Sequence, residues 1–355
     1  MLRKPKVCIL YTGGTIGMVT GSNGVRRPPE DPADFIAVAP RVKDIAEIDF
    51  YLVPRAVGIL NKDSIDMVTS DWEAVANEIY RHLNQGYDGF VIVHGVDTMA
   101  FTAAAVTFAF GRRLNIPIVF VGGQTVASLP YGDGEINLVR ACKVATLPLA
   151  EVVICFNNKV LRGCRAQKRD DRDFDAFESP GIAPLCIIKD PLDLAEHARR
   201  ARIDATQDVS LKAKFVSGIL TVPITPATPP EMLLPAIRSP ECRGVILQTS
   251  GGGNIPNVVE FSFLSLIEEA TAIGKPVIIT SMFPSDPNDF LTYQSGIDAR
   301  NHGAIQIKNM AFPALVAKLS WVLAHVGGSA GETIEAMMKT PLVNEIDSPG
   351  FSNPE

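Results

Sequence analysis

Residues 7–17 read VCILYTGGTIG, a short apolar run that stops at two glycines. An apolar run bounded by glycines is typical of a strand that is buried on both faces of a sheet. The glycines permit a sharp turn and leave room for a ligand beside the backbone. Thr15 therefore follows the carboxyl end of a strand, where open α/β sheets bind ligands, and is the first candidate for chemistry. The alternative is that Thr15 only caps the turn.

The rest of the chain repeats this alternation of a buried strand and a helix. Further strands are expected at 89–95, 116–123, 152–156, 244–248, 276–280 and 304–307, and helices at about 71–83, 98–110 and 313–325. The alternation predicts an α/β fold of two doubly wound domains with mainly parallel sheets. The charged stretch 189–214 is interpreted as the connection between them, so that the second domain begins near Phe215.

Composition narrows the class of protein. The 355 residues are 46% hydrophobic and 20% charged, which is typical of a globular chain long enough for two domains. A net charge of -6 without a basic tract argues against nucleic acid and anionic membranes as partners. No apolar run approaches the ~18 residues that span a bilayer, and the first strand begins too early for a signal peptide. Six cysteines without zinc spacing predict free thiols in a reducing, cytoplasmic compartment.

Three strand ends are expected to meet at one edge of the first sheet. They supply Thr15, the turn at 95–97 and the glycine pair at 122–123. Lys168, from a polar stretch at 161–180 interpreted as a solvated loop, could fold over them. A threonine nucleophile needs activation, a Lys–Asp pair can move a proton, and backbone N–H groups at glycine turns can hold an oxyanion. The set suits acyl transfer from an amide. Alternatively, Asp97 only caps the following helix and Lys168 is only a solvated side chain.

Two stretches carry a resemblance to a known family. YTGGTIGM at 11–18 and HGVDTMAFT at 94–102 are similar to the two signatures of the L-asparaginase/glutaminase family, and more narrowly of its cytoplasmic type I branch. Further similar stretches are DSIDM at 63–67, DGEINL at 133–138, RGCRAQK at 162–168, FDAFESP at 174–180, GGGN at 251–254 and KLSWVL at 318–323. The similarity spans nearly all of residues 5–340.

The resemblance implies a domain organisation and an assembly. It implies an asparaginase-like catalytic domain at 1–190, a linker at 191–214 and a smaller C-terminal α/β domain at 215–342, followed by a frayed tail at 343–355. It implies a homo-oligomer, a dimer or a tetramer, that needs no metal and no organic cofactor. No Walker A motif occurs and no G-x-G-x-x-G follows a strand, so a nucleotide cofactor has no support from the residues either.

The resemblance also implies a reaction and the residues that perform it. In the family, the threonine that matches Thr15 attacks the side-chain amide carbon of L-asparagine and releases ammonia, and water later frees aspartate. The residues that match Asp97 and Lys168 work with a second threonine. The residues that match Asp63 and Ser64 hold the α-amino and α-carboxyl groups of the substrate. Substrate contacts are further expected at Gly95, Val96 and Gly123.

The chain departs from the family where the second threonine belongs. Val96 has the shape of threonine but no hydroxyl, and a positioned proton-transfer group typically contributes roughly a hundred- to ten-thousand-fold to a rate. Three explanations remain open: a deliberate change that traps an intermediate, a natural homologue with weak or altered activity, or a binding protein without turnover. Ile65, beside Ser64, and Val25, in an expected lid loop at 18–31, also replace polar residues of relatives.

Three functions therefore stay open at this point. The first is an amidohydrolase that acts on L-asparagine through an acyl-enzyme on Thr15. The second is a catalytically impaired homologue that binds asparagine or aspartate. The third is an amidotransferase component that passes ammonia to a partner.

Overall fold

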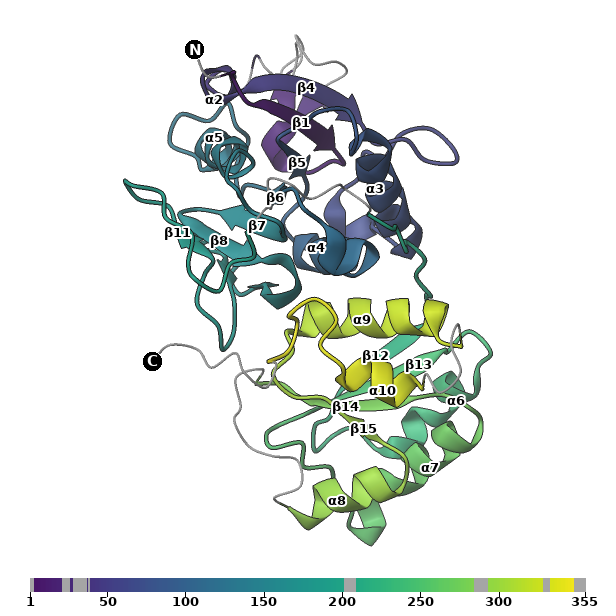
Figure 1. The fold of residues 1–355 in the computed structure, drawn as a ribbon. Coiled ribbons are helices and arrows are strands. Elements are labelled where there is room, and N and C mark those ends of the chain that lie inside the picture. Colours follow the sequence, from purple (N-terminus) through teal and green to yellow (C-terminus); the bar gives the residue numbers. More distant parts are fainter. Residues whose placement is uncertain are drawn as a thin grey trace. The chain divides into compact units, whose positions relative to one another are not determined.

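The structure is a computed structural model that describes residues 3–20, 26–27, 37, 39–200, 209–283, 293–327 and 333–347. The chain divides into two compact units, Met1–Ala213 and Lys214–Glu355 (Figure 1). Each is an α/β unit with its own sheet. Parts of the expected linker and tail lie outside the described residues, namely 201–208 and 348–355, and the expected domain boundaries stay a prediction.

The described part of the first unit is built on a seven-stranded sheet. Its spatial order is β11 (Cys186–Ile187), β8 (Lys159–Arg162), β7 (Val152–Phe156), β6 (Ile118–Val121), β5 (Gly89–Val93), β1 (Lys6–Tyr11) and β4 (Glu47–Leu52). The five strands from β7 to β4 are parallel, whereas β8 and β11 are antiparallel to their neighbours. The sheet is therefore mainly parallel, as the sequence predicts. Every residue of β5, β6 and β7 is buried, which explains why these strands are continuous apolar runs.

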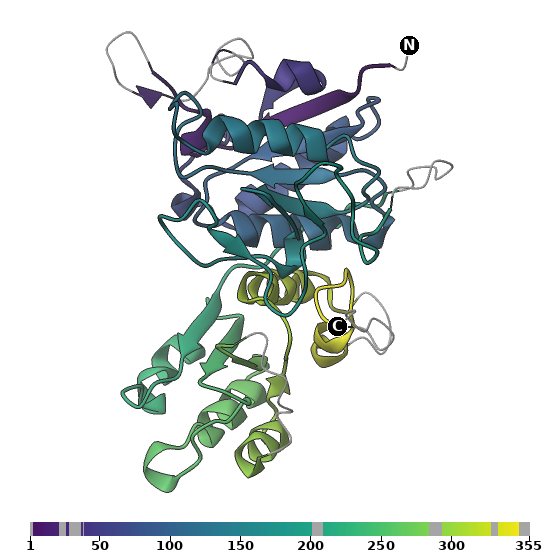
Figure 2. The ribbon, with the colours of Figure 1, turned by 90° about the vertical axis from the view of Figure 1, so that its left-hand side faces the viewer.

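Helices cover both faces of this sheet. The short α2 (Val42–Ile45) and α5 (Gly134–Val144) lie on one face, and α3 (Thr69–His82) and α4 (Met99–Phe110) lie on the other (Figures 1 and 2). Helix α3 turns its apolar residues toward the core, among them Trp72, Val75 and Ile79. Nearly every residue of α4 is buried, as its run of Ala and Phe predicts.

Shorter elements complete the first unit. They are the 3₁₀ turns η1 (Thr15–Gly17), η2 (Ser64–Asp66), η3 (Gly111–Arg113) and η4 (Gly163–Arg165), and the paired strands β2 (Val19–Thr20) with β3 (Arg26–Arg27) and β9 (Gln167–Lys168) with β10 (Phe177–Glu178). Several of these short elements carry the residues of the candidate site.

The second unit repeats the architecture on a smaller scale. In its described residues, β12 (Ile219–Pro223), β13 (Gly244–Thr249), β14 (Val277–Ser281) and β15 (Ile305–Gln306) form a four-stranded sheet that is parallel throughout. Around this sheet lie η5 (Pro230–Met232), α6 (Leu234–Arg238), η6 (Val259–Phe261), α7 (Leu264–Ala272), α8 (Gln294–Asn301), α9 (Phe312–His325) and α10 (Ile334–Lys339). Helices α6, α7 and α8 cover one face of the sheet, and α9 and α10 cover the other (Figure 1).

The interpretation of 161–180 as a solvated loop is wrong for its first part. Arg162 and Arg165 are buried, 5% and 3% exposed. Arg162 donates two hydrogen bonds to the buried Glu151 carboxylate, at 2.6 and 3.1 Å, and one to the carbonyl of His197 at 2.9 Å. A buried guanidinium is tolerated because its charge and its donors are matched in this way. Composition alone could not reveal that match, since Glu151 lies outside the polar stretch, just before β7.

No helix in the described ranges is both long and apolar enough to cross a membrane.

Candidate active site

The turns after β1, β5 and β6 lie side by side because these three strands are neighbours in one parallel sheet. A Cβ atom on Gly14, after β1, would lie 2.5 Å from the backbone nitrogen of Gly95, after β5. A Cβ atom on Gly122, after β6, would lie 2.9 Å from Cγ1 of Val96. Both distances are shorter than real Cβ contacts. The three turns are therefore packed tightly against one another at one edge of the sheet.

Two glycines set the path of the chain into this edge. Gly13 and Gly14 have φ angles of 125° and 91°, in the region that favours glycine. A Cβ atom on Gly13 would also lie 2.0 Å from the carbonyl oxygen of Lys62. Gly14 packs against Gly95, and the next residue, the half-buried Thr15, is the first residue of η1.

Ser64 ties a second loop to the same edge. Its side chain is fully buried, and its Oγ accepts hydrogen bonds from the backbone N–H groups of Asp97 at 3.2 Å and Thr98 at 3.4 Å. In return, Thr98 Oγ1 donates to the Ser64 carbonyl at 2.6 Å. Asp63 is exposed and accepts from the N–H of Ile65 at 3.3 Å. As an acceptor in these two bonds, the serine hydroxyl still carries its own proton.

Lys168 meets Asp97 although 71 residues separate them. Its Nζ lies 2.6 Å from Asp97 Oδ1 and equally 2.6 Å from Oδ1 of Asp171, so one ammonium group joins two carboxylates. The Lys168 side chain is 15% exposed and that of Asp97 is 48% exposed. Burial lowers the pKa of Lys168, but the hydrogen bonds to Asp171 and Asp97 outweigh it and raise the pKa above its ordinary value. Lys168 is therefore a cation at neutral pH.

A buried polar network supports the third turn. Asp133 accepts hydrogen bonds from the N–H groups of Gln124 and Thr125, each at 3.0 Å. Asn137, one helical turn further on, donates to Asp133 at 3.0 Å and to the carbonyl of Gly122 at 3.1 Å. The network fixes the backbone on both sides of Gly123.

Several expectations for single residues can now be compared with the geometry. The alternative that Asp97 caps the following helix is wrong, because the N-cap of α4 is Thr98 and the cap has no side-chain hydrogen bond. The solvated-lysine alternative is wrong for Lys168, whose side chain is largely buried and doubly paired. His94 is fully buried, and its ring bonds the Gly95 carbonyl at 2.7 Å and Thr102 Oγ1 at 2.9 Å, which fits a structural role. Val25 and most of the expected lid loop lie outside the described residues.

Four backbone N–H groups in these turns are already used as hydrogen-bond donors and cannot form the expected oxyanion hole. The N–H groups of Asp97 and Thr98 already donate to Ser64, and those of Gln124 and Thr125 already donate to a carboxylate. An oxyanion would therefore need other N–H groups in these turns, because each N–H group is a single donor.

Sequence reasoning missed two features of this site. Asp171 belongs to none of the motifs, although it stands three residues after Lys168 in a charge-rich run. The supporting role of Asp133 and Asn137 was also missed, although their i, i+4 spacing at the start of a helix places both side chains on one face. In the described part of the chain, no group of three or more His, Cys, Asp or Glu side chains could hold a metal ion.

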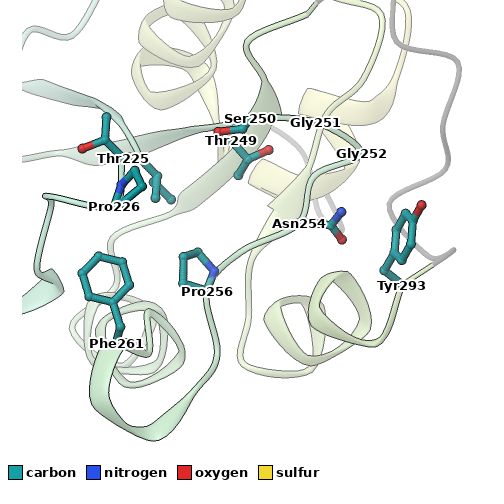
Figure 3. Close-up of a pocket in the computed structure, with 11 residues that line it drawn as sticks. Thr225, Pro226, Thr249, Ser250, Gly251, Gly252, Asn254, Pro256, Phe261 and Tyr293 are labelled. Atoms are coloured by element: carbon teal, nitrogen blue, oxygen red, sulfur yellow. The ribbon is translucent and has the colours of Figure 1, made fainter.

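The second unit has a pocket of its own at the carboxyl ends of its strands. Its volume is about 630 Å³, and Figure 3 shows Phe261 and Pro226 at one end, Tyr293 at the other and Asn254 between them. The GGGN stretch at 251–254 contributes to the lining, and Asn254 accepts a hydrogen bond from Ser295 at 3.0 Å. Residues 251–254 are among the stretches that carry the family resemblance. They lie at the carboxyl ends of the strands, which is the edge where parallel α/β sheets bind ligands.

Both units match families of known proteins. Residues 6–200 match the family described as asparaginase, N-terminal, and residues 219–338 match the glutaminase/asparaginase C-terminal domain. The chain belongs to the asparaginase family. L-asparaginase 1 of Escherichia coli (strain K12) is 30% identical over 350 residues, which cover 97% of this chain and 99% of the relative. The chain is therefore similar to enzymes that hydrolyse an amide bond.

Other relatives broaden the comparison. A glutamyl-tRNA(Gln) amidotransferase chain of Sulfolobus acidocaldarius is also 30% identical, over 96% of this chain and 76% of the relative. Among solved structures, the thermostable L-asparaginase from Thermococcus kodakarensis has a TM-score of 0.85 at 27% identity, covering 97% of this chain and 100% of that chain. The two-domain α/β fold is therefore that of the family, with a larger first and a smaller second domain.

Proposed function

We propose that the protein is an amidohydrolase that converts L-asparagine to L-aspartate and ammonia through an acyl-enzyme on Thr15. One observation carries the proposal: the Lys168–Asp97 ion pair stands at the strand edge where the Thr15 turn packs against Gly95, in a chain of the asparaginase family. That arrangement supplies a hydroxyl, a cation and a carboxylate, which together suit nucleophilic attack on an amide.

The proposed reaction has two steps. In the first, Thr15 Oγ attacks the side-chain amide carbon, its proton passes to the departing nitrogen, and ammonia leaves. In the second, water attacks the ester carbonyl carbon, the bond from that carbon to Thr15 Oγ breaks, L-aspartate leaves, and a proton from the water restores the Thr15 hydroxyl. Asp97 and Lys168 hold the charges that develop and move protons, while Asp63, Ser64, Gly95, Val96 and Gly123 contact the substrate. Each of these roles is part of the proposal.

The test is a time course of ammonia release from excess L-asparagine at a known protein concentration. We expect release to continue over many turnovers, and we expect Thr15→Ala to abolish it. Release that stops at or below one equivalent would contradict the proposal, because it would mean that Thr15 is acylated at most once. Full activity in the Thr15→Ala variant would remove Thr15 as the nucleophile.

A second function is favoured by Val96, which places a side chain without a hydroxyl beside Gly122. In that case the protein would bind asparagine or aspartate without efficient turnover. Calorimetry with each amino acid, run beside the ammonia assay, separates the two functions. Binding with no release supports the impaired homologue, and binding of neither amino acid contradicts both.

The similarity to an amidotransferase chain supports a third function, in which ammonia passes to a partner protein. The chain alone would then release ammonia slowly from asparagine or glutamine, and the rate of release would rise only when the partner protein is added.

We further propose that the protein is a cytoplasmic homo-oligomer, a dimer or a tetramer, in line with the family resemblance. Light scattering should then give a mass that is two or four times 38.2 kDa. A mass equal to that of one chain at micromolar concentration would contradict the assembly.

A further inference from the structure

The ammonium group of Lys168 has a second carboxylate partner that no motif of the family resemblance includes. Asp171 Oδ1 lies 2.6 Å from Lys168 Nζ, the same distance as Asp97 Oδ1. Asp97 comes from the turn before α4, and Asp171 comes from the charged segment that follows β9. Lys168 is therefore held from two separate parts of the chain.

We propose that Asp171 is a positioning residue, which holds the Lys168 ammonium group against Asp97 and so keeps this pair aligned with the Thr15 edge. The inference rests on the proposed function for its effect on the rate, but the contact itself does not depend on it.

The geometry of an ammonium group explains why a second partner matters. Lysine carries three N–H donors on a flexible four-carbon stem, so a single acceptor leaves the head free to swing about that one bond. Two carboxylate oxygens at 2.6 Å fix two of the three donors, and with them the direction of the third. The third N–H is then available, in a defined direction, to a ligand.

The exposure of the two partners sets the size of the effect. The Asp171 side chain is 89% exposed, against 48% for Asp97, so water and salt screen the Asp171 contact more strongly. Asp171 should therefore contribute less than Asp97 to the stability of the pair, and its contribution should fall as salt is added.

The protonation of Lys168 provides a readout that a merely structural residue would not change. Burial lowers the pKa of Lys168, whereas the bonds to Asp171 and Asp97 raise it. Loss of the Asp171 charge should move the pKa down. Lys168 would then lose its proton at a lower pH, and the alkaline limit of activity would move with it.

Other charged groups near Lys168 have partners elsewhere. On the paired strand β10, Glu178 accepts a hydrogen bond from Gln167 at 3.0 Å. Asp175 pairs with Lys159 at 2.6 Å, and Arg169 lies 3.8 Å from Asp173. Removal of any of these charges should therefore affect Lys168 only through space.

The experiment compares Asp171→Asn with Asp170→Asn in the full-length protein. Both variants remove one negative charge from the same segment. Asp170 accepts its bonds from the backbone N–H groups of Arg172 and Asp173, both at 2.7 Å, and an asparagine carbonyl can still accept them. Asp170→Asn is thus the matched control, and Asp171→Glu tests for rescue.

The first measurement is the pKa of Lys168, followed by NMR in protein labelled with ¹³C,¹⁵N-lysine, which leaves all three N–H donors in place, with the resonance assigned from a Lys168→Arg variant. We expect Asp171→Asn to lower this pKa by about half a unit to one unit, because the lost partner is close but exposed. Asp170→Asn should leave it within error, Asp171→Glu should restore most of it, and high salt should shrink the difference. An unchanged pKa in Asp171→Asn, or an equal fall in both asparagine variants, would overturn the inference.

The second measurement is kcat/KM for L-asparagine against pH. The alkaline limb should move down in Asp171→Asn by the same amount as the pKa, while Asp170→Asn should follow the unmodified protein. An alkaline limb that stays in place despite a lower Lys168 pKa would overturn the positioning role. If the pKa falls as expected but no variant and no form of the protein releases ammonia at any pH, the contact is supported and the proposed function is the part that fails.

Discussion

At the scale of single residues, position 96 is where chemistry and shape can be separated. Val96 is half-buried, and its Cγ1 lies next to the backbone of Gly122. Threonine has nearly the same volume, so Val96→Thr should leave the fold intact while it adds a hydroxyl near the Lys168–Asp97 pair. We expect the steady rate of ammonia release to rise by roughly a hundred-fold or more, the typical contribution of a positioned proton-transfer group.

The control for this prediction is Val96→Ala, which removes volume and adds no hydroxyl. Steady-state kinetics and the melting temperature should be measured on all three proteins. If threonine and alanine change the rate equally, the gain comes from altered packing, and the prediction fails.

The buried side chain of His94 should make the free energy of unfolding depend on pH. Burial lowers the pKa of His94 from 6.5 to about 4, more than the bond to the Gly95 carbonyl raises it. As the pH falls below 6.5, the unfolded chain binds a proton that the folded chain refuses. Stability is therefore lost as the pH falls from 6.5 toward 4, by about 3 kcal/mol in total, since one pKa unit corresponds to about 1.4 kcal/mol.

The measurement is the free energy of unfolding in urea at a series of pH values, for the unmodified protein and for His94→Gln. Other carboxylates titrate in the same range, and the difference between the two curves removes their contribution. The two curves should converge as the pH falls from 6.5 to 4. Parallel curves would show that His94 is not the group responsible.

At the scale of elements, the end of the second unit is fastened by a buried ion pair. Lys318, in the middle of α9, pairs with Glu345 at 2.5 Å, and both side chains are fully buried. Lys318 also donates to the carbonyls of Met338 at 2.8 Å and Thr340 at 2.7 Å, at and after the end of α10. Glu345 accepts from the N–H of Val343 at 2.7 Å. One side chain thus holds α10 and the segment after it against α9.

We expect Lys318→Met to reduce the free energy of unfolding by about 3–5 kcal/mol, because it leaves the buried Glu345 charge without a partner. The double variant Lys318→Met/Glu345→Gln should lose less, since no buried charge remains in it. Urea titration gives both values, and hydrogen exchange should show the loss of protection in α10 first. A single variant as stable as the unmodified protein would contradict this account of the segment.

The strands show what sequence could predict and why. β5, β6 and β7 are buried on both faces, so each is an uninterrupted apolar run that can be recognised from consecutive residues of the sequence. Contacts between distant residues carry no such local signal. The burial of Arg162 depends on Glu151, and the pairing of Lys168 depends on the path of the segment that carries Asp171. The turns of the candidate site were therefore predictable from their glycines, and the pairing of Lys168 with Asp97 was expected from the resemblance, whereas the second partner of Lys168, Asp171, was not predictable.

At the scale of the whole molecule, the two units have separate hydrophobic cores, and the reactivity of buried cysteines can measure how readily each core opens. All six cysteines are buried thiols. The first unit holds Cys8, Cys142, Cys155, Cys164 and Cys186, and the second holds Cys242. Because each thiol lies inside a core, its reaction with a reagent in solution requires that core to open.

This distribution leads to a prediction for thiol labelling. Burial raises the pKa of Cys142 and of Cys155 to about 12, so at pH 8 only about one thiol in ten thousand is the reactive thiolate even where a reagent can reach it. We expect Ellman's reagent to find no fast-reacting thiol in the native protein and to titrate all six in denaturant. Peptide mass spectrometry during slow labelling should give Cys242 a rate of its own, because its core can open without that of the first unit. A cysteine that reacts within seconds under native conditions would contradict the burial, and a Cys242 rate equal to that of the other cysteines at every denaturant concentration would show that the two cores open as one.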